Sequence, residues 1–374
     1  MTRMAGVRIP KFASIRRALG ANFGIQKDTG KTMIPVSRLN PKFANPPAAK
    51  SCERRIRGTG VRGFVAGLLL LALAQFPCGS ALAQGHTDWV TKFPLDPVPV
   101  ATWPGGKKVA VSFALFVEVF GFGQGPVLRP DLAARNPDLV NEAFRQYAIT
   151  EGNLRVGRLF KDLDVPLTIV LNAAFPAAQP ATWKEFRASQ PNAPIVAHGI
   201  NNSNDILPLG RGLTEQKAYI RRTLDQIAAA TGVRPTGWSS PSVYSNGDTM
   251  QAMAAEGITY NIDQMDSDFI SRLKTPDGPL VLLPYPTVTV DMGQFLARMK
   301  SPREIKTLWL DYVLELAREA PAREATTVVI GLHPFVVGTP DGAAAMRRVL
   351  ARLKREDTVW LTDTAALVQA AGPK

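Results

Sequence analysis

The chain has 374 residues, with 44 Lys and Arg against 31 Asp and Glu, two Cys and three His. The positive charge is concentrated at the start: residues 1–83 hold 14 basic and two acidic residues, which leaves 30 basic and 29 acidic residues in the remainder. This balance excludes charge-driven binding of nucleic acid by residues 84–374. Both cysteines, Cys52 and Cys78, lie in the first part, so disulfides and thiolate chemistry are excluded from the remainder.

The first 83 residues have the pattern of an export leader. A short apolar run at 64–74 follows four arginines and precedes Ala81-Leu-Ala83, which is typical of a signal peptide over 54–83 cleaved near Ala83. The run is shorter than the roughly 20 apolar residues of a transmembrane span. We therefore expect a periplasmic or secreted protein without stable membrane insertion after cleavage; the alternative is a retained N-terminal anchor. Residues 1–53 are predicted to be a disordered or untranslated extension.

The rest of the chain alternates strand and helix patterns. Residues 84–107 are expected to be extended because prolines interrupt regular structure there. In chain order, apolar periodicity then predicts a strand at 108–117, a helix at 151–163, a strand at 165–171, a helix at 180–189, a strand at 194–199, a helix at 213–231, a strand at 235–239, a helix at 247–256, strands at 258–262 and 280–283, a helix at 302–319, a strand at 326–332, a helix at 340–355, a strand at 358–361 and a helix at 363–371.

Such alternation predicts an α/β fold with a parallel sheet covered by helices, in a single domain over 108–374. Polar residues recur at many successive strand ends, which favours a closed or partly open (β/α) barrel of seven or eight strands over a doubly wound sheet.

Polar and aromatic side chains at or after the predicted strand ends form the candidate site. They are Glu118, His198, Asn202, Trp238, Asp263, Asp266, Tyr285, Asp291 and His333. A barrel gathers such residues at the C-terminal ends of its strands, and carboxylates with imidazoles suit either general acid–base catalysis or a metal site. The simpler alternatives are satisfied buried imidazoles, a solvent-facing carboxylate at Glu118, and aromatic rings that pack at the barrel rim.

Several catalytic motifs are absent from the sequence. It contains no GxSxG elbow, no HExxH and no GxxxxGK[ST], and the glycines at 121, 123 and 125 do not form a dinucleotide fingerprint. Water is therefore the expected nucleophile of any hydrolytic reaction.

A set of ordered short motifs resembles the polysaccharide deacetylase superfamily, in its branch near metal-independent, allantoinase-like hydrolases. The motifs are Trp103-Pro-Gly-Gly-Lys-Lys-Val-Ala-Val, Val165-Pro-Leu-Thr, Val196-Ala-His198-Gly, Thr231-Gly-Val-Arg-Pro-Thr-Gly-Trp238 and Leu332-His333-Pro-Phe. The resemblance covers roughly residues 100–370. It implies a deformed (β/α) barrel that hydrolyses a non-peptide C–N bond, typically an N-acetyl group of an amino sugar in carbohydrate metabolism.

The chain departs from the metal-binding motifs of that superfamily. Val117-Glu118 stands where the metal-dependent members have an Asp-Asp pair, and His198-Gly-Ile-Asn-Asn202 has an amide where they have a second His. Trp238-Ser-Ser-Pro241 lacks their arginine. The resemblance thus leaves two alternatives: no cofactor, or a single divalent metal such as zinc held by Glu118, His198 and Asn202.

The resemblance also assigns roles. Glu118 would be the general base or a metal ligand, and His333 the general acid. Substrate contacts are expected from His198, Asn202, Trp238, Asp266, Tyr285 and Asp291. The alternative for Asp266 and Asp291 is that they orient the histidines. The expected partner is a small-molecule or oligosaccharide substrate. Two other hypotheses are a non-catalytic periplasmic saccharide-binding protein and a ureide or cyclic amide hydrolase. The sequence sets no oligomeric state.

Overall fold

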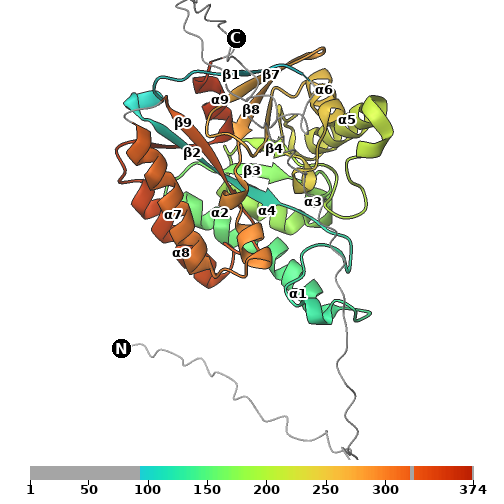
Figure 1. Cartoon of the computed structure of the whole chain (residues 1–374). Coiled ribbons are helices and arrows are strands. Elements are labelled where there is room, and N and C mark those ends of the chain that lie inside the picture. Colours follow the sequence, from blue (N-terminus) through green and yellow to red (C-terminus); the bar gives the residue numbers. More distant parts are fainter. Residues whose placement is uncertain (1–92, 321–323, 373–374) are drawn as a thin grey trace, which may run out of the picture. The chain divides into compact units, whose positions relative to one another are not determined.

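The computed structural model describes residues 93–320 and 324–372 (Figure 1). The predicted extension, the signal peptide, His86 and the start of the 84–107 segment lie outside these residues. Within them, no helix is both long and apolar enough to cross a membrane.

The strands are β1 (Leu95–Pro97), β2 (Val109–Val117), β3 (Thr168–Leu171), β4 (Ile195–Ala197), β5 (Gly237–Trp238), β6 (Tyr260–Gln264), β7 (Ser271–Thr275), β8 (Gly278–Pro284), β9 (Thr326–Leu332) and β10 (Val359–Thr362). The α-helices are α1 (Leu139–Tyr147), α2 (Asn153–Asp162), α3 (Phe175–Ala178), α4 (Pro180–Ser189), α5 (Gly212–Thr231), α6 (Gly247–Ala255), α7 (Pro302–Glu319), α8 (Pro340–Leu353) and α9 (Thr364–Ala370). Short 3₁₀ turns are η1 (Pro104–Gly106), η2 (Pro130–Leu132), η4 (Leu209–Arg211), η5 (Pro241–Val243) and η6 (Thr287–Thr289), and π-helical turns are η3 (Ala148–Gly152) and η7 (Gly293–Ala297).

Seven parallel strands form the barrel wall in the order β9-β2-β3-β4-β5-β6-β8. Strand β10 shares one edge of β2 with β3, because it pairs with 109–112 and β3 with 114–117. Between β8 and β9 the described residues form no ladder. Thr289 Oγ1 bridges that gap by donating to the Val329 carbonyl at 3.1 Å. The barrel is therefore partly open, and beyond β8 the wall continues as antiparallel β7 and β1.

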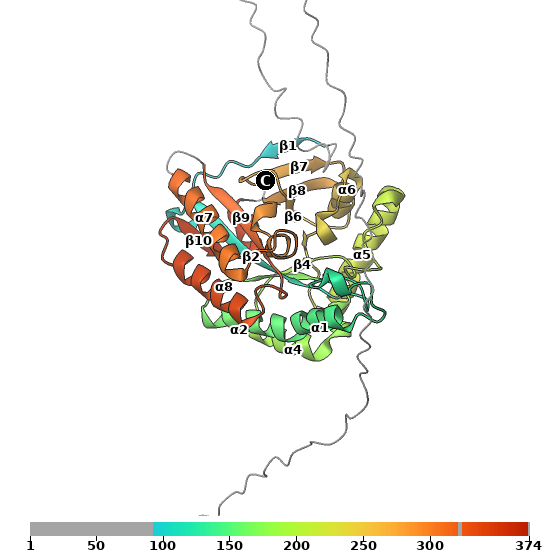
Figure 2. The same cartoon turned by 60° about the horizontal axis from the view of Figure 1, so that its bottom comes forward.

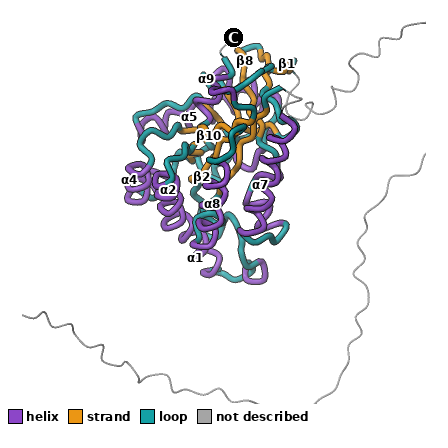
Figure 3. Tube along the Cα trace, turned by 90° about the vertical axis from the view of Figure 1, so that its left-hand side faces the viewer, coloured by secondary structure: helices purple, strands orange, loops and turns teal. Residues whose placement is uncertain are grey.

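Side-chain alternation along the strands divides the core into two layers. On β2, Val109, Val111 and Phe113 join the cluster that packs against the helices, whereas Ala114 and Phe116 join a second cluster inside the barrel. Helices α2, α4, α5, α6, α7 and α8 surround the strands in Figure 2, and Figure 3 shows helices on both sides of them. The helix-facing layer excludes water from the outer wall, so the strand ends are held in fixed positions.

The predicted α/β barrel is confirmed, but the sequence did not predict β7 and α1, nor the short strand β1 and the short helix α3. Strand β7 has a mixed burial pattern, and it forms a hairpin with β8 around the turn at Pro276-Asp277, so it resembles a loop in sequence. Helix α1 was missed because its apolar Leu139 and Val140 are exposed; it begins instead at an Asp138 cap that accepts from the Asn141 backbone N–H.

Candidate active site

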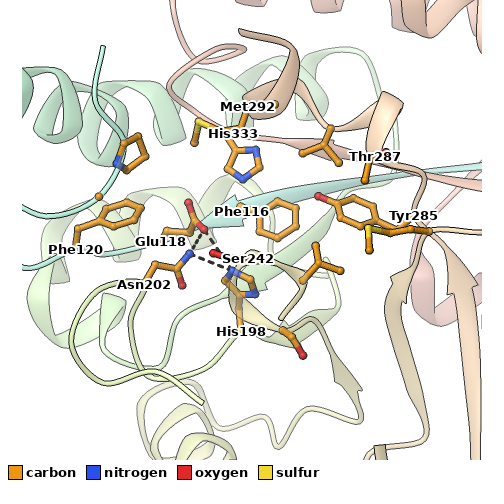
Figure 4. A pocket seen from close by; sticks show the side chains of 17 residues that line it. Phe116, Glu118, Phe120, His198, Asn202, Ser242, Tyr285, Thr287, Met292 and His333 are labelled. Carbon is orange, nitrogen blue, oxygen red and sulfur yellow. Dashed lines mark hydrogen bonds and ion pairs between the residues drawn. The ribbon is translucent and has the colours of Figure 1, made fainter. Parts of the chain in front are cut away.

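The site lies at the C-terminal ends of the barrel strands, in a cavity of about 540 Å³. The side chain two positions beyond an inward-facing residue also faces inward, which takes Phe116 on β2 to Glu118, Val196 on β4 to His198 and Gly331 on β9 to His333. Figure 4 shows Glu118, His198, Asn202, Tyr285 and His333 around this cavity. The remaining lining residues are Phe116, Phe120, Gly125, Pro126, Ser240, Ser242, Val243, Met265, Thr287, Val290, Met292 and Gly293.

Glu118, His198 and Asn202 form one hydrogen-bonded cluster. His198 Nε2 lies 3.3 Å from Glu118 Oε1, and the Asn202 amide nitrogen donates to the same carboxylate oxygen. His198 Nδ1 lies 2.8 Å from the Ser239 carbonyl, which can only accept, so Nδ1 carries a proton. This bond fixes the imidazole so that Nε2 faces Glu118.

His333 and Asp291 form a second buried pair. Asp291 accepts from His333 twice, from Nδ1 at 2.7 Å and from the backbone N–H at 2.7 Å. Burial by itself would lower the pKa of His333, but the Asp291 charge and hydrogen bond, with a smaller contribution from the Glu118 charge, raise that pKa above its ordinary value. His333 can therefore hold a proton near neutral pH while it faces the cavity, which is what a general acid needs.

The ring of Phe116 lies between the two histidines (Figure 4). His333 stacks on it with centroids 4.6 Å apart and an interplanar angle of 6°, and His198 meets it edge-to-face at 5.0 Å. An aromatic face attracts a cation, so this stacking also favours the protonated form of His333. The ring therefore separates His198, which lies beside the candidate general base Glu118, from His333, the candidate general acid.

The hydroxyl of Tyr219 anchors the loop that carries Asn202. Tyr219 on α5 accepts from the Ile200 backbone N–H at 2.9 Å and donates to the Asp205 carbonyl at 2.8 Å. Burial raises the pKa of Tyr219 to about 12, so the hydroxyl stays protonated and keeps its donor role.

On the facing loop, Ser242 and Val243 both have left-handed backbone conformations, with φ of 57° and 55°. Such strain in non-glycine residues is concentrated at functional sites.

Two predicted site residues lie elsewhere. Trp238 is buried in the helix-facing layer, because Gly237 takes the inward position of β5 and Trp238 therefore points outward. Its indole N–H donates to Ser240 Oγ. Asp266 is exposed two residues beyond the end of β6 and does not line the cavity. Asp291 does not line the cavity either; its carboxylate is hydrogen-bonded to His333, the contact expected if it orients a histidine.

Asn172 and Asp263 do not line the cavity but contact residues that do, and they were not among the predicted substrate contacts or ligands. Asn172 is the inward residue that follows β3, and its side chain contacts Asn202. The alternation of Thr168 and Val170 carried one step further would have identified it. Asp263 was noted only as a strand-end residue; its carboxylate accepts from the Ser240 backbone N–H at 2.9 Å. Burial raises the pKa of Asp263.

The predicted metal ligands meet, but their arrangement does not fit zinc. Asn202 turns its NH₂ group toward Glu118 and His198, and its carbonyl oxygen accepts from Asn172 at 3.1 Å. Only two donor side chains then face one another, whereas a catalytic zinc takes three protein ligands. Within residues 93–320 and 324–372, no three His, Cys, Asp or Glu side chains are grouped so that they could hold a metal ion.

The fold matches solved structures of deacetylase type. A protein described as a polysaccharide deacetylase from Mycobacterium smegmatis is 24% identical, with a TM-score of 0.62, over 74% of this chain and 94% of that one. Another so described, from Pseudomonas aeruginosa PAO1, is 22% identical with a TM-score of 0.63 over 73% and 93%. The Puue allantoinase is 23% identical with a TM-score of 0.63 over 73% and 93%.

No family model and no curated protein matches the chain. The solved structures confirm the fold that the sequence motifs implied. At these identities the activity has to be argued from the site itself.

Proposed function

We propose that this protein is a hydrolase of non-peptide C–N bonds that acts without a metal ion. The observation that carries this proposal is the pairing of functions across one cavity: a carboxylate, Glu118, on one side and a proton donor, His333 held by Asp291, on the other. The likeness in fold to deacetylases and to an allantoinase supports it by analogy.

The arrangement accounts for each proton of the reaction. Glu118 takes a proton from a water molecule as the water oxygen attacks the amide carbonyl carbon. The C–N bond then breaks, and His333 Nε2 donates its proton to the departing nitrogen. Glu118 ends protonated and His333 neutral, so one proton passes to His333 through solvent before the next turnover.

The lining of the cavity favours a compact, uncharged substrate. Among the described residues, no Lys or Arg lines it, so a carboxylate or phosphate on the substrate would lack a cationic partner. Nonpolar walls at Met265, Met292 and Val290 face the polar groups of Glu118 and His333. N-acetylated amino sugars satisfy these requirements. Neutral ureides and cyclic amides satisfy them too. They are the second candidate class of substrate, and the limited cavity volume supports them because they are smaller.

The test is turnover of both substrate classes by the full chain in the presence of a chelator. Acetate release would be followed with N-acetylated oligosaccharides and ring opening with neutral cyclic ureides, beside the variants Glu118→Gln and His333→Ala. Glu185→Gln, a surface change on α4, is the matched control. Loss of chelator-resistant turnover in the two site variants alone is the expected result. Binding without turnover would favour the non-catalytic saccharide-binding protein.

We also propose that the protein acts in the periplasm or outside the cell. The apolar run at 64–74 and the Ala81-Leu-Ala83 pattern support this. N-terminal sequencing after bacterial expression should give a chain that begins at Gln84, whereas an uncleaved cytoplasmic chain would contradict export.

A further inference from the structure

A chain of side-chain amides runs from the backbone of the β2–α1 loop to the candidate base. The Val119 backbone N–H donates to Asn172 Oδ1 at 3.0 Å. A backbone N–H can only donate, so the oxygen of the Asn172 amide must face Val119. Its NH₂ group then faces the opposite way, where it donates to the His198 carbonyl and to Asn202 Oδ1. Asn172 is fully buried, so its amide cannot exchange these partners for water.

The orientation of Asn202 follows from that of Asn172. Because Asn202 Oδ1 accepts from Asn172, its NH₂ group is directed at Glu118 Oε1 and lies 3.4 Å from His198 Nε2. The Asn202 backbone is also held, since its N–H donates to the Val119 carbonyl at 3.1 Å. The reversed amide would place two oxygens against each other at Glu118 and two NH₂ groups against each other at Asn172.

We propose that Asn172 is a positioning residue that sets the orientation of the Asn202 amide and thereby closes the Glu118–His198 pair to metal ions. An amide nitrogen directed at this pair presents hydrogens and has no lone pair for a cation. The inference rests on the proposed function only for the role of Glu118. Its test measures metal binding rather than turnover, so this inference and the proposed hydrolase function can fail separately.

The first arm of the test changes the group at position 202. In Asn202→Asp, one carboxylate oxygen can still accept from Asn172, while the other gives Glu118 and His198 a third donor. We expect titration with Co²⁺ to show at least tenfold tighter binding than wild type, at one ion per chain, with the visible absorption of a low-coordinate site. The double variant with His198→Ala should lose it. One Co²⁺ bound by the wild-type chain and lost in Glu118→Gln would overturn the proposal.

The second arm changes only the orienting residue. In Asn172→Asp, one carboxylate oxygen still accepts from the Val119 N–H. The other oxygen replaces the NH₂ group that donated to Asn202, and it can only accept. Asn202 should therefore turn its NH₂ group to position 172 and its oxygen to Glu118 and His198. This creates a Co²⁺ site in which the third ligand is the unchanged Asn202. Asn192→Asp, in an exposed loop, is the matched control and should bind no more Co²⁺ than wild type.

A folded Asn172→Asp variant that binds no Co²⁺ while Asn202→Asp does would refute the role of Asn172. If Asn172→Asp does not fold, the wild-type chain still decides the matter by NMR. The side-chain amide protons of Asn202 should show nuclear Overhauser contacts to the His198 ring; contacts to the Asn172 amide protons instead would refute the orientation.

Discussion

Replacing Asp291 by Asn tests whether a buried carboxylate makes His333 an acid. The backbone N–H of His333 can only donate, so the amide oxygen of the replacement must take over that bond, now made to Asp291 at 2.7 Å. The NH₂ group then faces His333 Nδ1. A protonated Nδ1 would meet another donor, so the charged imidazole loses its partner and the neutral Nε2–H form is favoured.

The size of the effect follows from the lost interaction. A hydrogen bond to a charged group contributes about 1.5–3 kcal/mol. Since a factor of ten corresponds to about 1.4 kcal/mol, kcat/KM near neutral pH should fall about 10- to 150-fold. The pKa of His333 is raised by Asp291 and lowered by burial, so removing the carboxylate lowers it. The alkaline limb of the pH profile, where the acid loses its proton, should therefore move to lower pH.

The assay is kcat/KM across the pH range on the substrate identified in the turnover test. Asp311→Asn, on the exposed side of α7, is the matched control and should keep the wild-type profile. A wild-type profile and rate in Asp291→Asn would refute the reasoning that the carboxylate supports the charged imidazole. Near-UV circular dichroism of each variant would separate a local change from unfolding.

Three further predictions concern the base, stability with pH and barrel packing. Glu118→Gln should reduce kcat about 10²- to 10⁴-fold with substrate binding retained, as titration calorimetry would show; a wild-type kcat would exclude Glu118 as the base. Because the pKa of His333 is raised from 6.5, the charged pair stabilises the fold fully below that pH, and the contribution is lost as pH rises through the folded-state value. The difference in Tm between wild type and Asp291→Asn should therefore become smaller as pH rises, and a difference that grows with pH would contradict this direction. Gly331→Ala places a Cβ against the Tyr285 ring and should lower the free energy of unfolding by about 1–3 kcal/mol in urea, unlike Gly210→Ala, where the added methyl has open space; equal stability of the two would contradict the packing argument.

Local sequence determined most of the barrel and the strand ends. Continuous apolar runs of strand length identified the strands now seen as β2 and β9, because their inner and outer faces are both buried. The ends of the same runs placed Glu118 and His333 at strand ends. The sequence was misleading where a strand was too short to show which residues face inward: β5 has only two residues, and Trp238 points outward.

Only the tertiary structure decided how the site residues act. That Asp291 binds His333, 42 positions away in the sequence, depends on a loop after β8 folding back beside β9. The direction of the Asn202 amide depends on Asn172, which comes from a third strand and carries no motif. A residue type and a strand end can be read from sequence, because periodicity is local. A hydrogen-bond direction cannot, because its partners come from strands that only the closing of the barrel brings together.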